Sequence, residues 1–353
     1  MSKLNLAIVF GGKSTEHEIS LLSTRSILTH INEEKYNISL IYIDIDGHWS
    51  LKETIDSTSA IPITIIPGSK GAILIDTSSG KHLSIIDVAF PVLHGVFGED
   101  GTIQGFFKMM NVPFVGCGVM ASSACMDKDM TKRVLRDAGI GIAPYAIATP
   151  NHKPTFQELE KHLGTPMFIK PANLGSSVGV FKVSNEAEYK EKIEEALTFD
   201  PKVLIEKAIL GKEVECAVLG NDKPKASLPG EVVMTTEFYD FESKYVDKDA
   251  SSTRVPADIT ESQIDTVRDT AVKAYKAMGC EGLSRVDFFV TNEGEILINE
   301  INTIPGFTSI SMYPKMWEAT GIPYPELIDI LIELGIERYN QEQELRIVAR
   351  EVK

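Results

Sequence analysis

The sequence predicts an α/β protein whose N-terminal region contains a mostly parallel sheet. An apolar run at Leu4–Phe10 ends at a Gly11-Gly12 turn, and a helical segment, Glu18–His30, follows it. Further apolar runs at Ile38–Ile43 and Ile85–Phe90 have the length and composition of strands. Strands that alternate with helices in this way are typical of an α/β domain with a parallel sheet.

The rest of the N-terminal region is rich in turn residues. Residues 51–84 contain short apolar runs without a clear pattern, and Gly95–Gly105 is a loop dense in glycine and acidic residues. We expect a buried strand at Val112–Val115, before a Gly116-Cys117-Gly118 turn. These features place the first domain at residues 1–121.

A smaller α+β unit is predicted next, at residues 122–211. It begins with a strongly charged helix, Met126–Asp137, and Gly139–Thr149 follows as a linker and a strand. The next expected elements are, in order, helix Phe156–Leu163, strand Met167–Ile169, a loop, strand Gly179–Val183, helix Glu186–Phe199 and strand Val203–Glu206.

The third domain is expected at residues 212–353. Cys216–Leu219 and Val232–Met234 resemble strands, and Glu261–Met278 is an amphipathic helix. Between them lies a polar segment, Thr235–Ser252, with few apolar residues. Its length indicates a functional lid.

Composition narrows the classes of partner. The 353-residue chain carries a net charge of −15, which argues against nucleic acid or an anionic membrane as partner but not against a small anion. Its four cysteines have no metal-ligand spacing, which fits a cytoplasmic protein. The apolar run Leu4–Phe10 is too short to span a membrane.

A glycine- and serine-rich loop, residues 170–180, is a candidate phosphate site. Gly175 and Gly179 allow backbone conformations that let a ligand approach the main chain, and Ser176 and Ser177 add hydroxyl donors. Lys170 adds a positive charge suited to phosphate. Taken alone, the stretch fits a flexible hairpin tip equally well.

A second candidate site lies on a hairpin near residues 285–302. If Glu293-Gly294 forms a two-residue turn, Asp287 faces Glu300 and Arg285 faces Asn302 on one side of the sheet. Facing carboxylates destabilise a sheet unless a cation lies between them, and carboxylate and amide oxygens are ligands of Mg²⁺. The alternative is a solvated acidic face that Arg285 neutralises. A metal together with a phosphate loop indicates a nucleoside triphosphate.

Several motifs in the same order resemble those of the D-alanine–D-alanine ligases, members of the ATP-grasp superfamily, over nearly the whole chain. The motifs are Gly11-Gly12-x-Ser14-x-Glu16-x-Glu18-x-Ser20, His94-Gly95-x-x-Gly98-Glu99-Asp100-Gly101, Met126-Asp127-Lys128 with Lys132, Lys170-Pro171 with Gly175-Ser176-Ser177-x-Gly179, Glu206-Lys207 with Glu213, Phe238-Tyr239-Asp240 with Lys244-Tyr245, Arg285-x-Asp287, and Glu300-x-Asn302-x-x-Pro305-Gly306. The resemblance implies a three-domain ATP-grasp architecture, in which an N-terminal substrate-binding domain precedes two α+β domains that grip ATP.

The resemblance also implies roles for single residues. ATP would be bound by Lys132, Lys170, Ser177, Glu206, Lys207, Ile209, Glu213, Phe238, Lys244 and Phe289, and Mg²⁺ (or Mn²⁺) by Asp287, Glu300 and Asn302. The amino-acid substrates and the reacting atoms would be held by Glu16, Ser176, Tyr245, Arg285, Gly306 and Ser311.

The implied reaction is the ATP-dependent ligation of two D-alanines through a D-alanyl phosphate, for peptidoglycan precursor synthesis. The implied assembly is a homodimer. Two alternatives stay open at this stage: a ligase that joins D-alanine to D-serine or D-lactate, and a non-catalytic ATP-binding sensor on the same fold. The segment Phe238-Tyr239-Asp240 with Lys244-Tyr245 favours D-alanine over D-lactate and leaves D-serine open.

Overall fold

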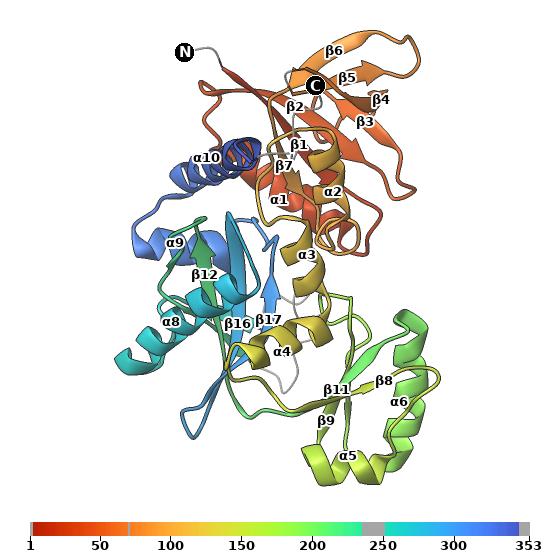
Figure 1. Ribbon diagram of the computed structural model, residues 1–353, viewed down its shortest axis with the longest axis vertical. Coiled ribbons are helices and arrows are strands. Elements are labelled where there is room, and N and C mark those ends of the chain that lie inside the picture. Colours follow the sequence, from red (N-terminus) through yellow and green to blue (C-terminus); the bar gives the residue numbers. More distant parts are fainter. Residues whose placement is uncertain (1–2, 70, 235–250, 346–353) are drawn as a thin grey trace, which may run out of the picture.

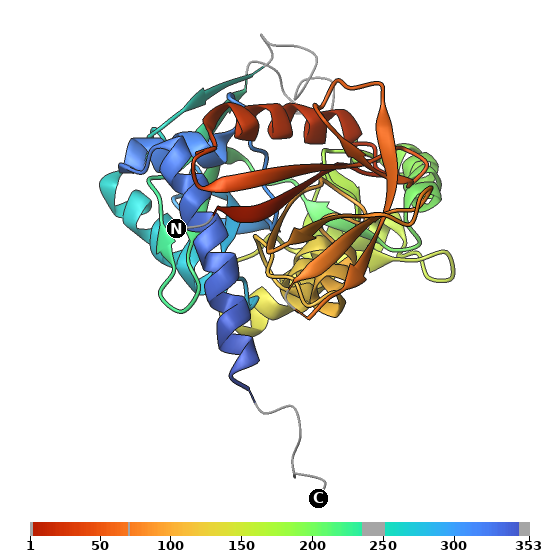
Figure 2. The same cartoon turned by 90° about the horizontal axis from the view of Figure 1, so that it is seen from above.

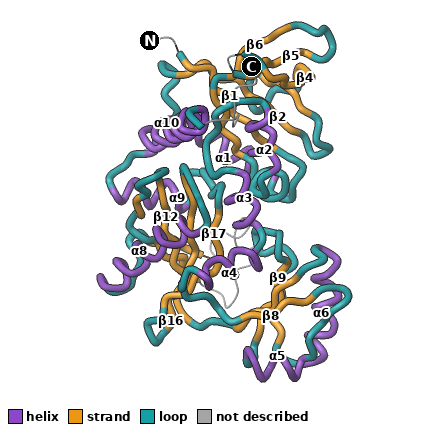
Figure 3. Tube along the Cα trace, viewed as in Figure 1, coloured by secondary structure: helices purple, strands orange, loops and turns teal. Residues whose placement is uncertain are grey.

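The structure, a computed structural model, describes residues 3–69, 71–234 and 251–345. Within these residues the strands form three sheets, which lie in three separate parts of the molecule (Figure 3). The predicted α/β fold is confirmed.

The first sheet is built around β1 (Leu4–Gly11), which lies between β2 (Tyr36–Ile43) and β7 (Val88–Val92) and is parallel to both. The helix α1 (His17–His30) packs on β1. Leu6, Ile8 and Phe10 on one face of β1 and Ala7 and Val9 on the other are fully buried, so burial on both faces accounts for the continuous apolar run.

The parallel part of this sheet is smaller than predicted. Residues 51–84, which showed no clear pattern in the sequence, supply most of four antiparallel strands: β3 (Trp49–Lys52), β4 (Ala60–Pro67), β5 (Ala72–Asp76) and β6 (His82–Ile86). Short turns join them, and a short connection allows only an antiparallel neighbour. The single strand predicted at Ile85–Phe90 was wrong, because the chain leaves β6 at Ile86 and enters β7 at Val88.

One more prediction in the connecting region was wrong. Val112–Val115 follows α2 (Thr102–Met109) and is buried, but it makes a single bridge, Ala89 to Phe114, and no strand. The charged helix predicted at Met126–Asp137 is confirmed as α4 (Lys128–Asp137), which begins two residues later, and a helix that was not predicted, α3 (Val119–Met126), precedes it. They separate at Asp127, whose side chain accepts hydrogen bonds from the Asp129 and Met130 amides and so caps α4.

The second sheet has the order β10-β9-β11-β8 and is antiparallel. Its elements are β8 (Tyr145–Ala148), α5 (Phe156–Leu163), β9 (Met167–Pro171), β10 (Phe181–Val183), α6 (Glu186–Phe199) and β11 (Val203–Lys207). They match the predicted order, and among the described residues the buried side chains of their core all come from residues 148–205. In Figure 1 this unit lies at the lower end of the molecule.

The third sheet has the order β15-β14-β12-β16-β17, and β13 pairs with β12. Its strands are β12 (Gly211–Leu219), β13 (Lys225–Ala226), β14 (Gly230–Met234), β15 (Ser251–Arg254), β16 (Leu283–Thr291) and β17 (Ile296–Asn302). The helix α8 (Glu261–Ala277), as predicted, packs on it, and α3 and α4 contribute to the same core. The predicted lid lies almost wholly outside the described residues.

The last two helices return the chain to the first sheet. These are α9 (Met312–Thr320) and α10 (Tyr324–Gln343), whose apolar side chains share one core with β1, β2 and β7. Figure 2 shows α10 beside the strands of the first sheet. Among the described residues, no helix combines the length and apolar character needed to cross a membrane.

Candidate active site

A cavity of about 520 Å³ lies between the second and third sheets. One wall comes from β9, β11 and the glycine-serine loop, and the other from β12, β14, β16 and β17. It brings together nine of the predicted site residues: Lys170, Ser176, Ser177, Glu206, Lys207, Ile209, Glu213, Phe289 and Glu300. The cavity therefore unites the phosphate-loop candidate with the metal-hairpin candidate.

A buried charge triad, Lys132–Glu206–Lys170, joins α4 to the second sheet. Glu206 lies 3.0 Å from Lys132 Nζ and 2.7 Å from Lys170 Nζ through its two carboxylate oxygens. Burial raises the pKa of Glu206, but the two ammonium groups outweigh burial and lower that pKa to about 2. Two cations share one anion, so the triad favours a further anion nearby.

The two lysines of the triad differ in their surroundings. Burial lowers the pKa of Lys132, a side chain only 1% exposed, and Glu206 offsets only part of that effect. Burial also acts on Lys170, but there the carboxylates of Glu206 and Glu300 raise the pKa above its ordinary value. Lys170 lines the cavity and is the lysine of the pair better suited to carry charge to a ligand.

The hairpin of β16 and β17 places Asp287 opposite Glu300 and Arg285 opposite Asn302, as predicted. The predicted two-residue turn was wrong. Thr291 pairs with Glu295 around a three-residue loop, and a bulge at Asn299 then restores the expected register at Glu300. The loop is one residue longer than predicted, and the bulge adds one residue to β17. The two shifts in register cancel, so the predicted pairs of Asp287 and Arg285 are correct.

The hairpin carboxylates lie in a dense network. Arg285 donates to both oxygens of Asp287 at 2.7 Å, and its Nε lies 3.1 Å from Glu215 on β12. Burial lowers the pKa of Arg285, but Asp287 and Glu215 more than offset it, so the guanidinium stays charged. Sequence reasoning missed Glu215, which shares its face of β12 with Glu213.

The donor set on this hairpin fits a hard divalent cation. Asp287 and Glu300 offer carboxylate oxygens, and Asn302 offers an amide oxygen. The Asn302 amide donates to Asp287 through Nδ2 at 3.1 Å, so its oxygen is not used in that hydrogen bond. Lys128, a further residue missed from the sequence, has its Nζ 3.5 Å from Glu300.

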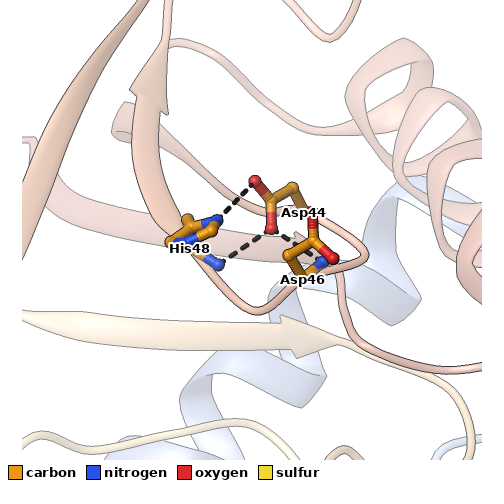
Figure 4. A group of neighbouring side chains, drawn as sticks. All are labelled: Asp44, Asp46 and His48. Atoms are coloured by element: carbon orange, nitrogen blue, oxygen red, sulfur yellow. Dashed lines mark hydrogen bonds and ion pairs between the residues drawn. The ribbon is translucent and has the colours of Figure 1, made fainter.

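Another acidic group, Asp44, Asp46 and His48, has possible ligand atoms within 4.8 Å of one another (Figure 4). The Asp44 carboxylate accepts hydrogen bonds from the Asp46 and His48 amides at 2.9 Å and contacts the His48 ring at 3.1 Å. These bonds close the turn between β2 and β3, and they account for the cluster without a metal.

The glycine-serine loop reaches a residue of the first region. Ser176 Oγ donates a hydrogen bond to the Glu16 carboxylate, which lies before α1. Ser176 and Ser177 both adopt left-handed backbone conformations, with φ of 51° and 59°. Gly95 packs against the same carboxylate, because a Cβ there would lie 2.7 Å from Glu16 Oε2. Glu16 is therefore at the junction of the first region with the cavity loop.

His94 and Glu99 belong to this junction but were not among the predicted site residues. His94 is buried, with Nδ1 3.1 Å from the Ile304 carbonyl and 3.7 Å from Glu99, and Nε2 3.1 Å from Ser23. Burial lowers the pKa of His94, but Glu99 outweighs it and raises the pKa above its ordinary value. The signal was present in the His94-Gly95-x-x-Gly98-Glu99 motif.

The segment after β17 brings Gly306 and Ser311 together. Ser311 Oγ accepts a hydrogen bond from the Thr308 amide at 3.0 Å, and a Cβ on Gly306 would lie 2.8 Å from that oxygen. Three predicted site residues, Phe238, Lys244 and Tyr245, lie outside the described residues.

The fold and the cavity define the class of protein. A small antiparallel sheet carries lysines, a larger sheet carries carboxylates, and the two enclose a cavity between them. This is the ATP-grasp arrangement, in which a nucleotide lies between two sheets beside the substrate that it activates.

Comparisons with known proteins identify the family within that class. Residues 5–117 match the family model described as D-ala D-ala ligase N-terminus, and residues 134–333 match D-ala D-ala ligase C-terminus. The chain is 47% identical to D-alanine–D-alanine ligase A of Escherichia coli (strain K12), with 98% of this chain and 99% of that protein covered.

Solved structures of ligases are similar to this chain over nearly its whole length. The D-alanine–D-alanine ligase of Coxiella burnetii is 39% identical with a TM-score of 0.88, over 98% of this chain and 97% of that one. The VanG D-Ala:D-Ser ligase of Enterococcus faecalis is 36% identical with a TM-score of 0.84, over 95% of this chain and 100% of that one. The chain belongs to the D-alanine–D-alanine ligase family.

Proposed function

We propose that this protein joins two D-alanines to D-alanyl-D-alanine in the cytoplasm, with conversion of ATP to ADP and phosphate, and so supplies a peptidoglycan precursor. The observation that carries the proposal is the contact between Ser176 and Glu16. It connects the cavity between the two sheets to a carboxylate suited to an amino-acid ammonium group. A nucleotide and an amino acid bound on either side of this contact would meet at their reactive ends.

The cavity walls suit the parts of ATP. Lys132 and Lys170 supply positive charge for the phosphates, with Ser177 as a hydroxyl donor and Lys244 near the γ-phosphate. The adenine and ribose would contact the remaining nucleotide residues, namely Glu206, Lys207, Ile209, Glu213, Phe238 and Phe289.

Asp287, Glu300 and Asn302 would hold Mg²⁺ (or Mn²⁺), since their oxygens form the donor set described above. The ion, when bound, neutralises phosphate charge during phosphoryl transfer. Arg285, held by Asp287 and Glu215, lies beside that donor set.

The proposed reaction has two steps. Glu16, with Ser176 and Tyr245, binds the ammonium group of the first D-alanine. A carboxylate oxygen of that D-alanine attacks the γ-phosphorus of ATP, which releases ADP. The amine of the second D-alanine, its carboxylate held by Ser311, attacks the carbonyl carbon of the D-alanyl phosphate. The Arg285 guanidinium and the Gly306 amide donate to the tetrahedral oxyanion, and phosphate leaves as the amide forms.

The test is phosphate release from ATP with purified protein and Mg²⁺. We expect turnover with D-alanine alone, no turnover after chelation of divalent cations, and recovery with Mg²⁺ or Mn²⁺. Negligible turnover with D-alanine alone, with turnover restored by D-serine or D-lactate, would reassign the second substrate. No turnover with any of them would indicate a nucleotide-binding sensor.

We also propose that the protein is a homodimer, as in the family it resembles. Sedimentation of the purified protein at micromolar concentration should give twice the 38.8 kDa mass of the chain.

A further inference from the structure

The bulge in β17 turns one extra side chain toward the nucleotide cavity. Asp287 pairs with Glu300 and Phe288 with Ile298, so Asn299 is the unpaired residue between them. Ile298 and Ile301 are both buried in the core although they are three residues apart, which strict alternation would forbid. As a result, Asn299 and Glu300 both line the cavity.

Asn299 contacts a lysine on the opposite wall. Lys170 Nζ donates to Asn299 Oδ1 at 3.1 Å and forms an ion pair with Glu206 Oε2 at 2.7 Å. The two acceptors belong to different sheets, since Glu206 is on β11 and Asn299 on β17. The Asn299 contact therefore joins the two walls of the cavity. It holds the Lys170 ammonium between Asn299 and Glu206 instead of against Glu206 alone.

The uncharged amide suits this position. Lys132, Lys170 and Glu206 together carry one net positive charge, and an amide oxygen accepts from Lys170 without cancelling it. A carboxylate at position 299, beside Glu300, would neutralise the charge that a phosphate needs. An apolar side chain would leave one ammonium donor without its acceptor.

We propose that Asn299 is a positioning residue for the nucleotide: its side-chain oxygen, brought into the cavity by the β17 bulge, holds the Lys170 ammonium where it meets the phosphates of ATP. The inference rests on the proposed function, because it takes Lys170 as a phosphate ligand. It adds a contact between the two sheets that form the cavity.

The test is a double-mutant cycle read as affinity for MgADP by calorimetry, without turnover. We expect Asn299→Leu to weaken binding about tenfold, the usual size for loss of a hydrogen bond to a charged group. In a Lys170→Met background the same change should cost less than twofold, because the lysine that it positions is gone. Asn299→Asp keeps an acceptor but adds charge, and it should weaken binding at least as much.

Asn292→Leu is the matched control, an exposed asparagine in the turn of the same hairpin, and it should leave the affinity within twofold. A loss of less than threefold in Asn299→Leu, or an undiminished loss in the Lys170→Met background, would overturn the inference. Unchanged affinity in Lys170→Met alone would instead overturn the phosphate role of Lys170 and with it the nucleotide part of the proposed function. If Asn299→Leu does not fold, the Asn299→Ala cycle decides by the same thresholds.

Discussion

At the scale of single residues, the site is an arrangement of charges that water cannot screen. Glu206 is held between the buried ammonium group of Lys132 and the partly buried one of Lys170, and Arg285 is held between two carboxylates. An ion alone in the interior is unfavourable, because its removal from water costs several kcal/mol. Lys132 on α4 and Lys170 on β9 are fixed beside Glu206, whereas Glu215 on β12 and Asp287 on its own strand β16 are fixed beside Arg285.

Loss of the Glu206 charge should destabilise the fold. In Glu206→Gln the two lysines lose their shared counter-ion, and we expect the free energy of unfolding to fall by about 3 kcal/mol, as when one partner of a buried pair is removed. Urea denaturation at neutral pH measures this. Glu194→Gln removes the exposed ion pair with Lys153 and should change the free energy by less than about 1 kcal/mol.

The same residue predicts a pH dependence. The pKa of Glu206 is lowered to about 2, so its stabilising effect is complete above the ordinary glutamate pKa of about 4.3 and is lost as pH falls from there towards 2. The wild-type protein should therefore lose stability across this range more steeply than Glu206→Gln. Equal slopes in acid urea titrations of the two proteins would contradict the assignment.

Ser176→Ala separates the two substrates. The change removes the donor to the Glu16 carboxylate, and we expect the KM for the first D-alanine to rise about tenfold while the KM for ATP changes less than twofold. Steady-state phosphate release gives both constants, and Ser184→Ala, at an exposed serine beside β10, is the control. Equal losses for the two substrates would make Ser176 a phosphate donor instead.

At the scale of elements, backbone contacts decide positions that side-chain patterns do not show. The helix α10 approaches the segment Val112–Val115 so closely that a Cβ on Gly335 would lie 2.5 Å from the Phe114 carbonyl oxygen. Arg338, one turn further along, donates to the Phe114 and Gly116 carbonyls. These bonds satisfy a buried segment that forms no strand.

Gly335→Ala tests this contact, because the close approach decides whether the change raises or lowers the free energy of unfolding. In an ordinary helix interior the change to alanine stabilises by about 0.5–1 kcal/mol. Here the methyl group meets fixed backbone, so we expect destabilisation of about 1–3 kcal/mol by thermal or urea unfolding. Gln341→Ala, at an exposed position of the same helix, should be close to neutral. A stabilised Gly335→Ala protein would show that α10 can move away.

The hairpin illustrates what could be predicted at this scale. The pairing of Asp287 with Glu300 on one face of the hairpin was predicted correctly, and Val286, Phe288 and Val290 of β16 form the opposite, buried face. The bulge was not predicted, although the spacing of Ile298 and Ile301 was a signal for it. A pattern of period two shows which side chains share a face, but a turn and a bulge depend on backbone geometry that the pattern does not report.

At the scale of the whole molecule, residues that pack in one core are not always neighbours in the sequence. The core of the first sheet includes Trp317, Leu327 and Leu331, which come from the far end of the sequence. The core of the second sheet is local, drawn only from residues 148–205. The domain limits of 1–121, 122–211 and 212–353 stay a prediction.

Fragments distinguish the two kinds of core. We expect residues 143–209 expressed alone to unfold cooperatively, because their core is complete. Residues 1–121 alone should not, since α9 and α10 are missing from their core, and addition of residues 312–353 should restore protection. Circular dichroism and amide exchange measure both. A cooperatively folded 1–121 fragment would show that α10 only covers a finished domain.

The sequence by itself determined the order of most elements and the family, because period, glycine turns and motif spacing are local properties of the chain, and it predicted Lys170, Asp287 and Glu300 as site residues. Only the tertiary structure decided which residues lie beside them. Asn299, Glu215 and Lys128 become site neighbours through a bulge, a strand pairing and a helix cap. Such contacts join segments far apart in the sequence, and their geometry depends on how whole sheets pack.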